Sequence, residues 1–351
     1  MSRVDRTWNR GWLIRLACVL TVLVGACSVT AADAAFSDTS GVVTTVSTNQ
    51  LAPPTAAALS QTCAPPPPVV FRGASSNSGS DAVYLVVPSG VQAGDVLVAQ
   101  VSNYGGVFSG VIAPSGWTLV GRATSAGAVT EAVYWKIAGS AEPIYYGFSL
   151  SGSPGVQMAG GMAAYGGVDR TAPVNAFGTA TGAGTTASTP SVTTTVADTV
   201  LVHSVSKRRD DLPAPAGTTQ LWRQASGNGS STEGSTASYE SFAGPGSTPV
   251  RTTSTGFSSE WVTHTIALRP VPGTPSVTGS WTASSSTWAT GYVLERVAGG
   301  VVQATGTLAP VSATSATDGP LANGVTYTYR VSSYFRSWTS TPATATFTTN
   351  C

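Results

Sequence analysis

Short stretches in which apolar and polar residues alternate follow one another along most of the chain. Clear examples are VLVAQVS at 96–102 and TYTYRVSSYF at 326–335, and turns rich in Gly, Ser and Pro separate such stretches. A period of two is typical of strands with one buried face. The composition agrees, because 42% of the 351 residues are hydrophobic, only 9% are charged and 39 are Gly, which favours short strands over helices. The sequence therefore predicts an all-β protein with two or more folded units.

The C-terminal segment from 275 to 351 carries a recognisable pattern of core residues. LANGVTYTYRV at 321–331 has the form L-x-x-G-x-x-Y-x-Y-x-V, and large apolar residues lie on the alternating strands before it. This segment resembles a fibronectin type III domain. The resemblance places Trp281 on strand B, Tyr292 and Leu294 on strand C, and Leu321, Tyr327, Tyr329 and Val331 in the approach to strand F. It implies a seven-stranded β-sandwich in which Tyr327 forms the tyrosine corner.

The first strand of this sandwich is missing from 275–351. A proline-rich entry and a plausible first strand occur far upstream, in LAPPTAAALSQTC at 51–63. We therefore expect residues 51–63 to supply the first strand, residues 64–270 to be inserted between the first and second strands, and residues 271–351 to complete the module. APPPP at 64–68 and RPVPGTP at 269–275 would be the two stiff connectors.

Two cysteines lie at the ends of this split domain. Cys63 closes the proposed first strand and Cys351 is the last residue of the chain. In the fibronectin-like arrangement the first and last strands finish at the same pole, so the resemblance implies a Cys63–Cys351 disulfide. In the chain-entropy model such a long loop contributes on the order of 5 kcal/mol. The alternative is a pair of free or intermolecular thiols.

The inserted segment repeats itself loosely in the same order. GDVLVAQVS at 94–102 is echoed by ADTVLVHSVS at 197–206, AVYWKIAG at 132–139 by ASYESFAG at 237–244, and the GFS at 147–149 by that at 256–258. This repetition predicts two halves of similar layout that form one jelly-roll-like β-sandwich around a shared core. The polar stretch 179–195 between the halves is expected to be a loop or an exposed edge strand.

The first 34 residues are typical of an export signal. Four arginines precede an apolar run at 16–30, which at about 15 residues is too short to span a bilayer, and Ala32-Asp33-Ala34 offers a cleavage site. AFSDTSGVVTTVST at 35–48, in the expected linker 35–50, resembles the start of mature proteins with SipW-dependent signal peptides. The GDVLVA, APSGWTLV and YWK segments of the insert resemble domains of actinobacterial surface proteins. Alternatively, Cys27 after Val24-Gly25-Ala26 would be lipidated.

Charge and side-chain chemistry exclude several function classes. A net charge of +1 provides no long-range attraction for nucleic acid or an anionic membrane. His203 and His264 are expected to be solvated or on edge strands, without a nucleophile elbow. The five glutamates at 131, 142, 233, 240 and 260 are scattered and expected mostly at solvated turns. Asn77 and Asp81 are typical of an ordinary turn as much as of calcium ligands. We therefore expect no catalytic residue, metal or cofactor.

Aromatic residues in two loops of the C-terminal module give the best candidate site. Trp288 lies between strands B and C, while Phe335, Arg336 and Trp338 lie between F and G. These loops project from the end of the sandwich opposite the insertion, so we expect an uncovered surface for sugar rings or a partner protein, with Tyr334, Arg336 and Arg296 as polar or cationic contacts. The alternative is that Trp288 and Trp338 pack together and close a small core.

These features predict a secreted, non-enzymatic protein of the cell surface or extracellular matrix, with no membrane span in the mature chain. Its expected role is adhesion or binding, and its expected partner is an extracellular polysaccharide or a surface protein. Two alternatives remain open at this point: a catalytic or accessory component of polysaccharide degradation, and the structural subunit of a surface fibre.

Overall fold

The computed structural model describes residues 50–104, 110–126, 128–152, 155–208, 212–227 and 232–351, together with strands β1 (Ala34–Ser37) and β2 (Val43–Val46). Residues 1–33 of the predicted export signal (1–34), which include the alternative lipidation site Cys27, lie outside these residues. β1 begins at Ala34, the last residue of that predicted signal, and pairs antiparallel with β2 in the expected linker 35–50. The described residues contain strands and connections but no α-helix, so the fold is all-β, as predicted. In this part of the chain, no helix has the length and apolar character to cross a membrane.

Two sheets form the C-terminal module. One has the order β22-β19-β3 and the other the order β21-β20-β23, with β24 and β25 also paired to β23. The strands are β3 (Thr55–Ala64), β19 (Thr274–Thr282), β20 (Gly291–Ala298), β21 (Val301–Leu308), β22 (Ser315–Asp318), β23 (Thr326–Phe335), β24 (Trp338–Thr339) and β25 (Ala343–Thr348). This is the strand arrangement of a fibronectin type III-like sandwich.

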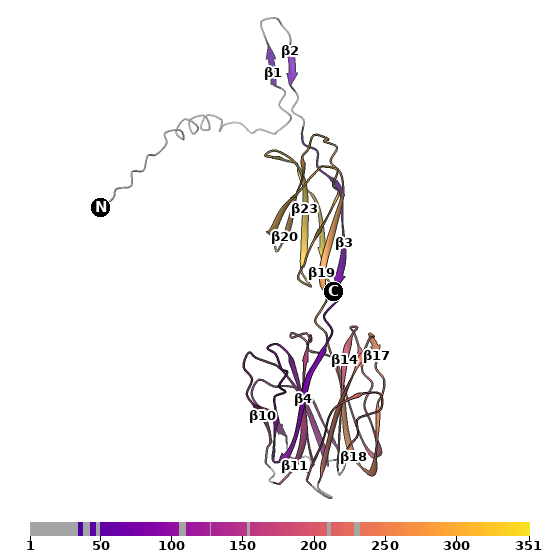
Figure 1. Ribbon diagram of the computed structural model, residues 1–351. Coiled ribbons are helices and arrows are strands. Elements are labelled where there is room, and N and C mark those ends of the chain that lie inside the picture. The colour runs from indigo at the N-terminus through magenta and orange to yellow at the C-terminus, as the bar shows by residue number, and fades with distance from the viewer. Residues whose placement is uncertain are drawn as a thin grey trace, which may run out of the picture.

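The strand β3 reaches this module from far upstream in the sequence. It pairs with β19 from Thr274↔Ala64 to Thr282↔Thr55, and Figure 1 shows the indigo β3 beside the orange β19. The chain leaves the module after β3 and returns at β19. The predicted disulfide is confirmed, because Cys63 and Cys351 are bonded with a Cα–Cα distance of 5.8 Å.

Five of the seven residues named from the fibronectin-like pattern are buried, and Leu294 and Tyr329 are partly buried. Trp281, Tyr292 and Val331 form one cluster, and Val277, Leu321 and Tyr327 form another. The Tyr327 hydroxyl accepts a hydrogen bond from the Ala322 amide at 3.4 Å, as expected for a tyrosine corner.

The segment between β3 and β19 contains two five-stranded antiparallel sheets. The first has the order β4-β11-β6-β9-β8 and the second the order β12-β18-β14-β16-β15. The strands of the first sheet are β4 (Val70–Ser80), β6 (Val96–Tyr104), β8 (Thr118–Ser125), β9 (Val129–Ile137) and β11 (Gln157–Gly166). Those of the second are β12 (Val174–Ser188), β14 (Thr199–Arg208), β15 (Thr219–Ser226), β16 (Glu233–Phe242) and β18 (Thr252–Leu268).

The two five-stranded sheets have the same strand order when each is numbered from its own first strand. The first half adds an outer sheet of β5 (Ala82–Val86), β10 (Tyr145–Leu150) and β7 (Val111–Ile112), whereas the second adds only the short pair β13 (Thr193–Thr194) and β17 (Gly246–Ser247). The proposed GFS equivalence is wrong, because Phe148 is buried in β10 and Phe257 is 61% exposed in β18.

The expectation of one shared core also needs correction. One large core lies between the two five-stranded sheets and includes Val98, Tyr165 and Ile266. A second lies between the first five-stranded sheet and its outer sheet and includes Leu97 and Phe148. Both faces of the first five-stranded sheet are therefore covered. Residues 174–188 form β12, an edge strand that pairs only with β18, which agrees with the exposed edge expected for 179–195.

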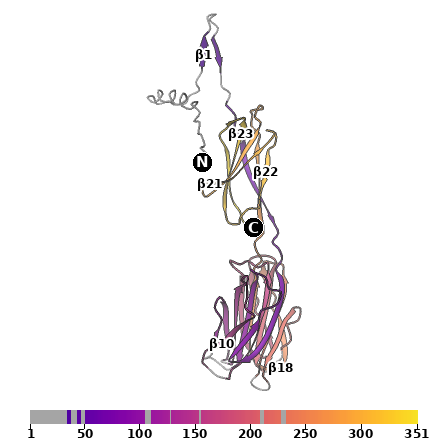
Figure 2. The ribbon, with the colours of Figure 1, turned by 60° about the vertical axis from the view of Figure 1, so that its left-hand side comes forward.

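Large side chains of one half fit against glycines of the other. A Cβ on Gly161 of β11 would lie 2.3 Å from Trp222 of β15, and a Cβ on Gly121 of β8 would lie 2.3 Å from Phe177 of β12. Such close approaches hold the two halves in register as one unit. Figures 1 and 2 show this unit and the C-terminal module arranged end to end, with the C-terminus between them.

Candidate functional site

The predicted aromatic residues gather at one end of the C-terminal module. The ring of Trp288, in the β19–β20 loop, contacts Phe335 edge-on with 5.3 Å between centroids. Phe335 pairs with Trp338 across the β23–β24 hairpin. Arg336, in the turn with φ of 52°, places its guanidinium 5.3 Å from the centroid of the Phe335 ring. Trp338 is 60% exposed and Trp288 is 36% exposed, so both keep surface available to a ligand.

This aromatic end lies away from the inserted unit. β19 starts at Thr274, next to Ala64, and runs toward Thr282, so the loop after it lies at the far end of the sandwich. Ala52 sits there, and its carbonyl accepts hydrogen bonds from Ser284 Oγ at 2.5 Å and from Ser333 Oγ at 2.6 Å. The segment that leads into β3 therefore anchors the base of the aromatic loops.

Of two further residues expected at this end, Tyr334 lies there and Arg296 does not. Tyr334 contributes its carbonyl, which accepts a hydrogen bond from the Thr290 amide at 2.8 Å and so fixes the loop that carries Trp288. Arg296 lies in the middle of β20, opposite Tyr329 of β23, and bonds across the sandwich to Asp318 of β22. Arg296 therefore does not belong to the aromatic end.

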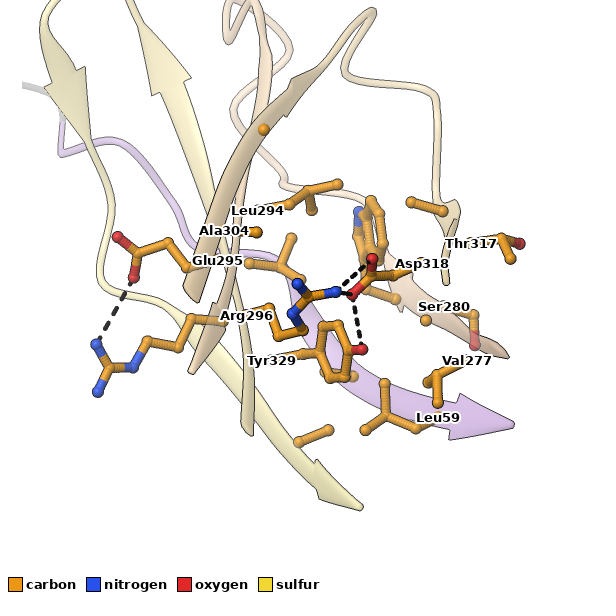
Figure 3. Close-up of a pocket in the computed structure, with 18 of the residues that line it drawn as sticks. Leu59, Val277, Ser280, Leu294, Glu295, Arg296, Ala304, Thr317, Asp318 and Tyr329 are labelled. Atoms are coloured by element: carbon orange, nitrogen blue, oxygen red, sulfur yellow. Dashed lines mark hydrogen bonds and ion pairs between the residues drawn. The ribbon is translucent and has the colours of Figure 1, made fainter. Parts of the chain in front are cut away.

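Arg296 instead lines a cavity between the two sheets of the module. The cavity has a volume of about 240 Å³, and its walls include Leu59, Trp281, Leu294 and Ala316. Figure 3 shows Arg296, Asp318 and Tyr329 pointing toward one another in this space, with Leu294 on one side and Leu59 and Val277 on the other. The cavity separates the two apolar clusters of the module.

The three polar side chains in this cavity form a closed set of contacts. Arg296 Nη1 donates to both carboxylate oxygens of Asp318, at 2.9 and 2.8 Å, and the Tyr329 hydroxyl donates to Asp318 Oδ2 at 2.8 Å. Burial raises the pKa of Tyr329 well above its usual range, and the hydrogen bond to Asp318 adds to the effect. The Arg296 and Asp318 side chains keep 23% and 34% of their surface exposed, so the set reaches solvent.

The two histidines were expected at the surface, and that expectation is wrong. His203 and His264 are fully buried in β14 and β18, which are inner strands of the second five-stranded sheet. His203 Nε2 lies 3.0 Å from Glu240 Oε1. Burial lowers the pKa of His203 below its ordinary value, and the hydrogen bond to Glu240 opposes this effect only in part.

Two of the glutamates are likewise buried and not at solvated turns. Glu131 of β9 and Glu233 of β16 are completely inaccessible. Glu131 accepts a hydrogen bond from Ser204 and lies 3.0 Å from His264 Nδ1. Burial raises the pKa of Glu233 far above its ordinary value, and the nearby Glu131 raises it further.

Serine, histidine and carboxylate meet in this layer, but in the wrong order for nucleophilic catalysis. A triad needs the hydroxyl on the histidine, whereas Ser204 donates to Glu131. Among the described residues, no group of three or more His, Cys, Asp or Glu side chains is placed to hold a metal. Asn77 Nδ2 donates to the Tyr84 carbonyl at 3.0 Å, and Asp81 Oδ1 accepts from the Val156 amide at 3.0 Å. Asn77 thus joins β4 to β5, and Asp81 joins the turn between these strands to the residue that precedes β11.

Comparisons with known proteins add little to this picture. The sequence matches no protein-family model and no curated protein. The solved structures with some likeness include the FN1-FN3 domains of chicken CNTN1, at 12% identity over 82% of this chain and 100% of that chain, with a TM-score of 0.21. Another is a domain segment of titin, at 12% identity over 84% of this chain and 100% of that one, with a TM-score of 0.18. These values are too low to carry an argument about function.

Sequence reasoning found the aromatic end but missed the cavity. Its signal was present, because Gly279 and Arg296 interrupt two strands whose other inward positions are apolar. A glycine and an arginine at inward positions of a small sandwich are exceptions to the usual core pattern, and such exceptions are expected at functional sites.

Proposed function

We propose that this protein is a secreted, non-enzymatic binding protein of the cell surface or extracellular matrix, and that the aromatic end of its C-terminal module binds polysaccharide. The observation that carries the proposal is the exposure of Trp288 and Trp338 on neighbouring loops. Large apolar surfaces exposed at one place on a soluble domain are typical of interaction sites.

The chemistry of this end suits sugar rings. A tryptophan offers a flat apolar face on which the C–H groups of a pyranose can stack, and it does so with little loss of side-chain entropy. Phe335 supports Trp288 through their edge-on contact. Arg336 provides hydrogen-bond donors beside the rings. With a net charge of +1 over the whole chain, recognition would rest on stacking and local hydrogen bonds.

Extracellular location is supported by three separate features. The N-terminal arginines, apolar run and cleavage pattern are those of an export signal. The Cys63–Cys351 disulfide fits an oxidising compartment. Sandwiches of the fibronectin type III kind are typical of extracellular proteins.

The test is binding of the purified protein to a panel of extracellular and cell-wall polysaccharides. Trp338→Ala and Trp288→Ala are each expected to weaken binding by roughly fivefold, in line with ~1 kcal/mol for one well-placed aromatic contact. Phe257→Ala is the matched control, because Phe257 is 61% exposed in β18 of the inserted unit. Its affinity should equal that of the wild type.

Two results would remove the proposal. The first is a polysaccharide that binds the wild type and both tryptophan variants equally well. The second is a wild-type protein that binds no polysaccharide on the panel but hydrolyses one of them. Circular dichroism of each variant would verify that the fold is retained.

A further inference from the structure

The C-terminal module contains one layer that does not follow the usual core pattern. Along β19 the inward positions are Val277, Gly279 and Trp281, and Val277 and Trp281 belong to different apolar clusters. Gly279 lies between them and lines the cavity. On the facing sheet, the corresponding layer is occupied by Arg296 and Tyr329. A glycine therefore faces a charged and a polar side chain where an apolar contact would be expected.

Neither backbone conformation nor crowding requires the glycine. Gly279 has no left-handed φ, and a Cβ placed on it would lie 3.6 Å from Leu59 and 3.9 Å from the Ala316 carbonyl oxygen. These are ordinary van der Waals distances. A strand glycine costs about 0.5–1 kcal/mol relative to alanine. The glycine that keeps this space open therefore lowers the stability of the module, and a larger residue at position 279 would restore that stability.

The polar groups in this layer determine what charge the space can accept. Arg296 and Asp318 neutralise each other. An anionic ligand would meet the Asp318 carboxylate and a cationic one the Arg296 guanidinium, so a neutral head group is favoured. Asp318 engages only Nη1 of Arg296, and the Arg296 side chain keeps 23% of its surface exposed where it lines the cavity. A ligand oxygen in the cavity would accept a hydrogen bond from the guanidinium, which carries five N–H donors.

We propose that the cavity beside Gly279 binds a neutral amphiphilic small molecule, with its apolar part between the sheets and a hydroxyl or carbonyl oxygen next to Arg296. The apolar part contacts Leu59, Leu294 and Ala316. An apolar cavity of about 150 Å³ holds benzene, so the observed volume suits roughly ten non-hydrogen atoms. This site is separate from the aromatic end and does not depend on polysaccharide binding.

Three compounds with the same tail and different head charges test the proposal. Phenylpropanol is neutral, phenylpropanoate is anionic and phenylpropylamine is cationic. Binding to the full chain would be measured by ligand-observed NMR and by titration of protein amide shifts. Phenylpropanol is expected to bind at millimolar or lower concentration, to shift the amides around Gly279 and Ala316, and to bind at least tenfold more tightly than either charged analogue.

Gly279→Val fills the cavity and should abolish phenylpropanol binding while the module stays folded. Gly256→Val is the control, because Gly256 is also a strand glycine without a left-handed φ and lies outside the module, and no atom of the described residues lies within 4 Å of its Cβ position. It should bind as the wild type does. If Gly279→Val failed to fold, Ala316→Val would take its place. Equal binding to the filled variant, tighter binding of a charged analogue, or no binding of phenylpropanol would each overturn the proposal.

Discussion

Removal of the disulfide should loosen the C-terminal module and leave the inserted unit intact. β3 is an edge strand, paired only with β19, and its own module resumes after an interruption of about two hundred residues. The side chain of Gln61 adds two hydrogen bonds to the chain terminus, since Nε2 donates to the Asn350 carbonyl at 2.7 Å and Oε1 accepts from the Asn350 amide at 3.0 Å. In the variant Cys63→Ser/Cys351→Ser, these contacts would remain without the covalent bond.

The stability lost on removal of the disulfide depends on whether the whole chain or only the C-terminal module unfolds. If the whole chain unfolds, the bond closes a loop set by a separation of 288 residues, and the chain-entropy relation predicts about 6 kcal/mol. If the inserted unit stays folded, its two ends remain together, because both contact residues 166–168: Val70 pairs with Gly166 at the start of the unit, and Pro270 bridges to Val168 at its end. The flexible loop is then roughly 90 residues, and the same relation predicts about 4.5 kcal/mol.

Urea unfolding followed by hydrogen exchange and mass spectrometry would measure the two units separately. Peptides from β23 should lose protection in the variant at a urea concentration where peptides from β14 are still protected. Reduced wild-type protein is the control and should behave as the variant does. A loss below about 1 kcal/mol in the module would refute the argument that the bond constrains the unfolded chain, and an equal loss in the inserted unit would refute the separation of the two units.

Three further substitutions test the packing and the buried charges. Glu233→Gln should raise the free energy of unfolding at neutral pH. Burial raises the pKa of Glu233, so the folded state binds more protons than the unfolded state above pH ~4.5. The stability of the wild type should therefore fall above this pH by up to ~1.4 kcal/mol per pH unit. Urea unfolding at pH 5 and pH 8 checks this, and a wild type-to-variant difference that does not grow with pH contradicts it. Gly161→Ala should destabilise the inserted unit by about 2 kcal/mol, because the new Cβ would meet Trp222 at 2.3 Å; thermal unfolding beside Gly256→Ala measures it, and equal midpoints would show that the Trp222 contact is not tight. Gly279→Ala should raise the free energy of unfolding of the C-terminal module by about 0.5–1 kcal/mol, and a loss of stability in urea would mean that the cavity is not free space.

The sequence was most informative where a sheet has one covered face. In the C-terminal module, alternation separates core from solvent, and the resemblance to a fibronectin type III domain identified Trp281, Tyr292 and Val331 as core residues; all three are buried. The pairing of β3 with β19 could be anticipated because a seven-stranded sandwich lacked its first strand. Cys63 and Cys351 then followed from the positions of the first and last strands.

The same alternating pattern gave wrong surface assignments where a sheet is covered on both faces. All but the last residue of β14 is buried, so the alternation in VLVHSVS distinguishes one covered face from the other and not core from solvent. His203 was therefore assigned to the surface, although it is fully buried. The expectation that Glu131 and Glu233 lie at solvated turns was wrong for the same reason. No local pattern reveals that a second sheet will pack on a given face, because that information lies in residues a hundred positions away.

The buried polar groups of the inserted unit and those of the module differ in their access to solvent, and this difference separates packing from binding. Gln100 Nε2 donates to Ser206 at 2.8 Å, and its Oε1 accepts from Ser235 at 2.7 Å. These bonds join the two five-stranded sheets. A shift of one sheet by two residues would break them and leave buried polar groups without partners, which costs the desolvation free energy of each group.

Glu131 and His264 join the same two sheets and have no exposed surface, so exchange with a ligand would require the sheets to separate. Arg296 and Asp318, by contrast, keep part of their surface exposed beside an existing cavity. A ligand could reach them without separation of any paired strands. Ligand binding is therefore expected in the C-terminal module. The polar layer of the inserted unit instead fixes the register between its two five-stranded sheets.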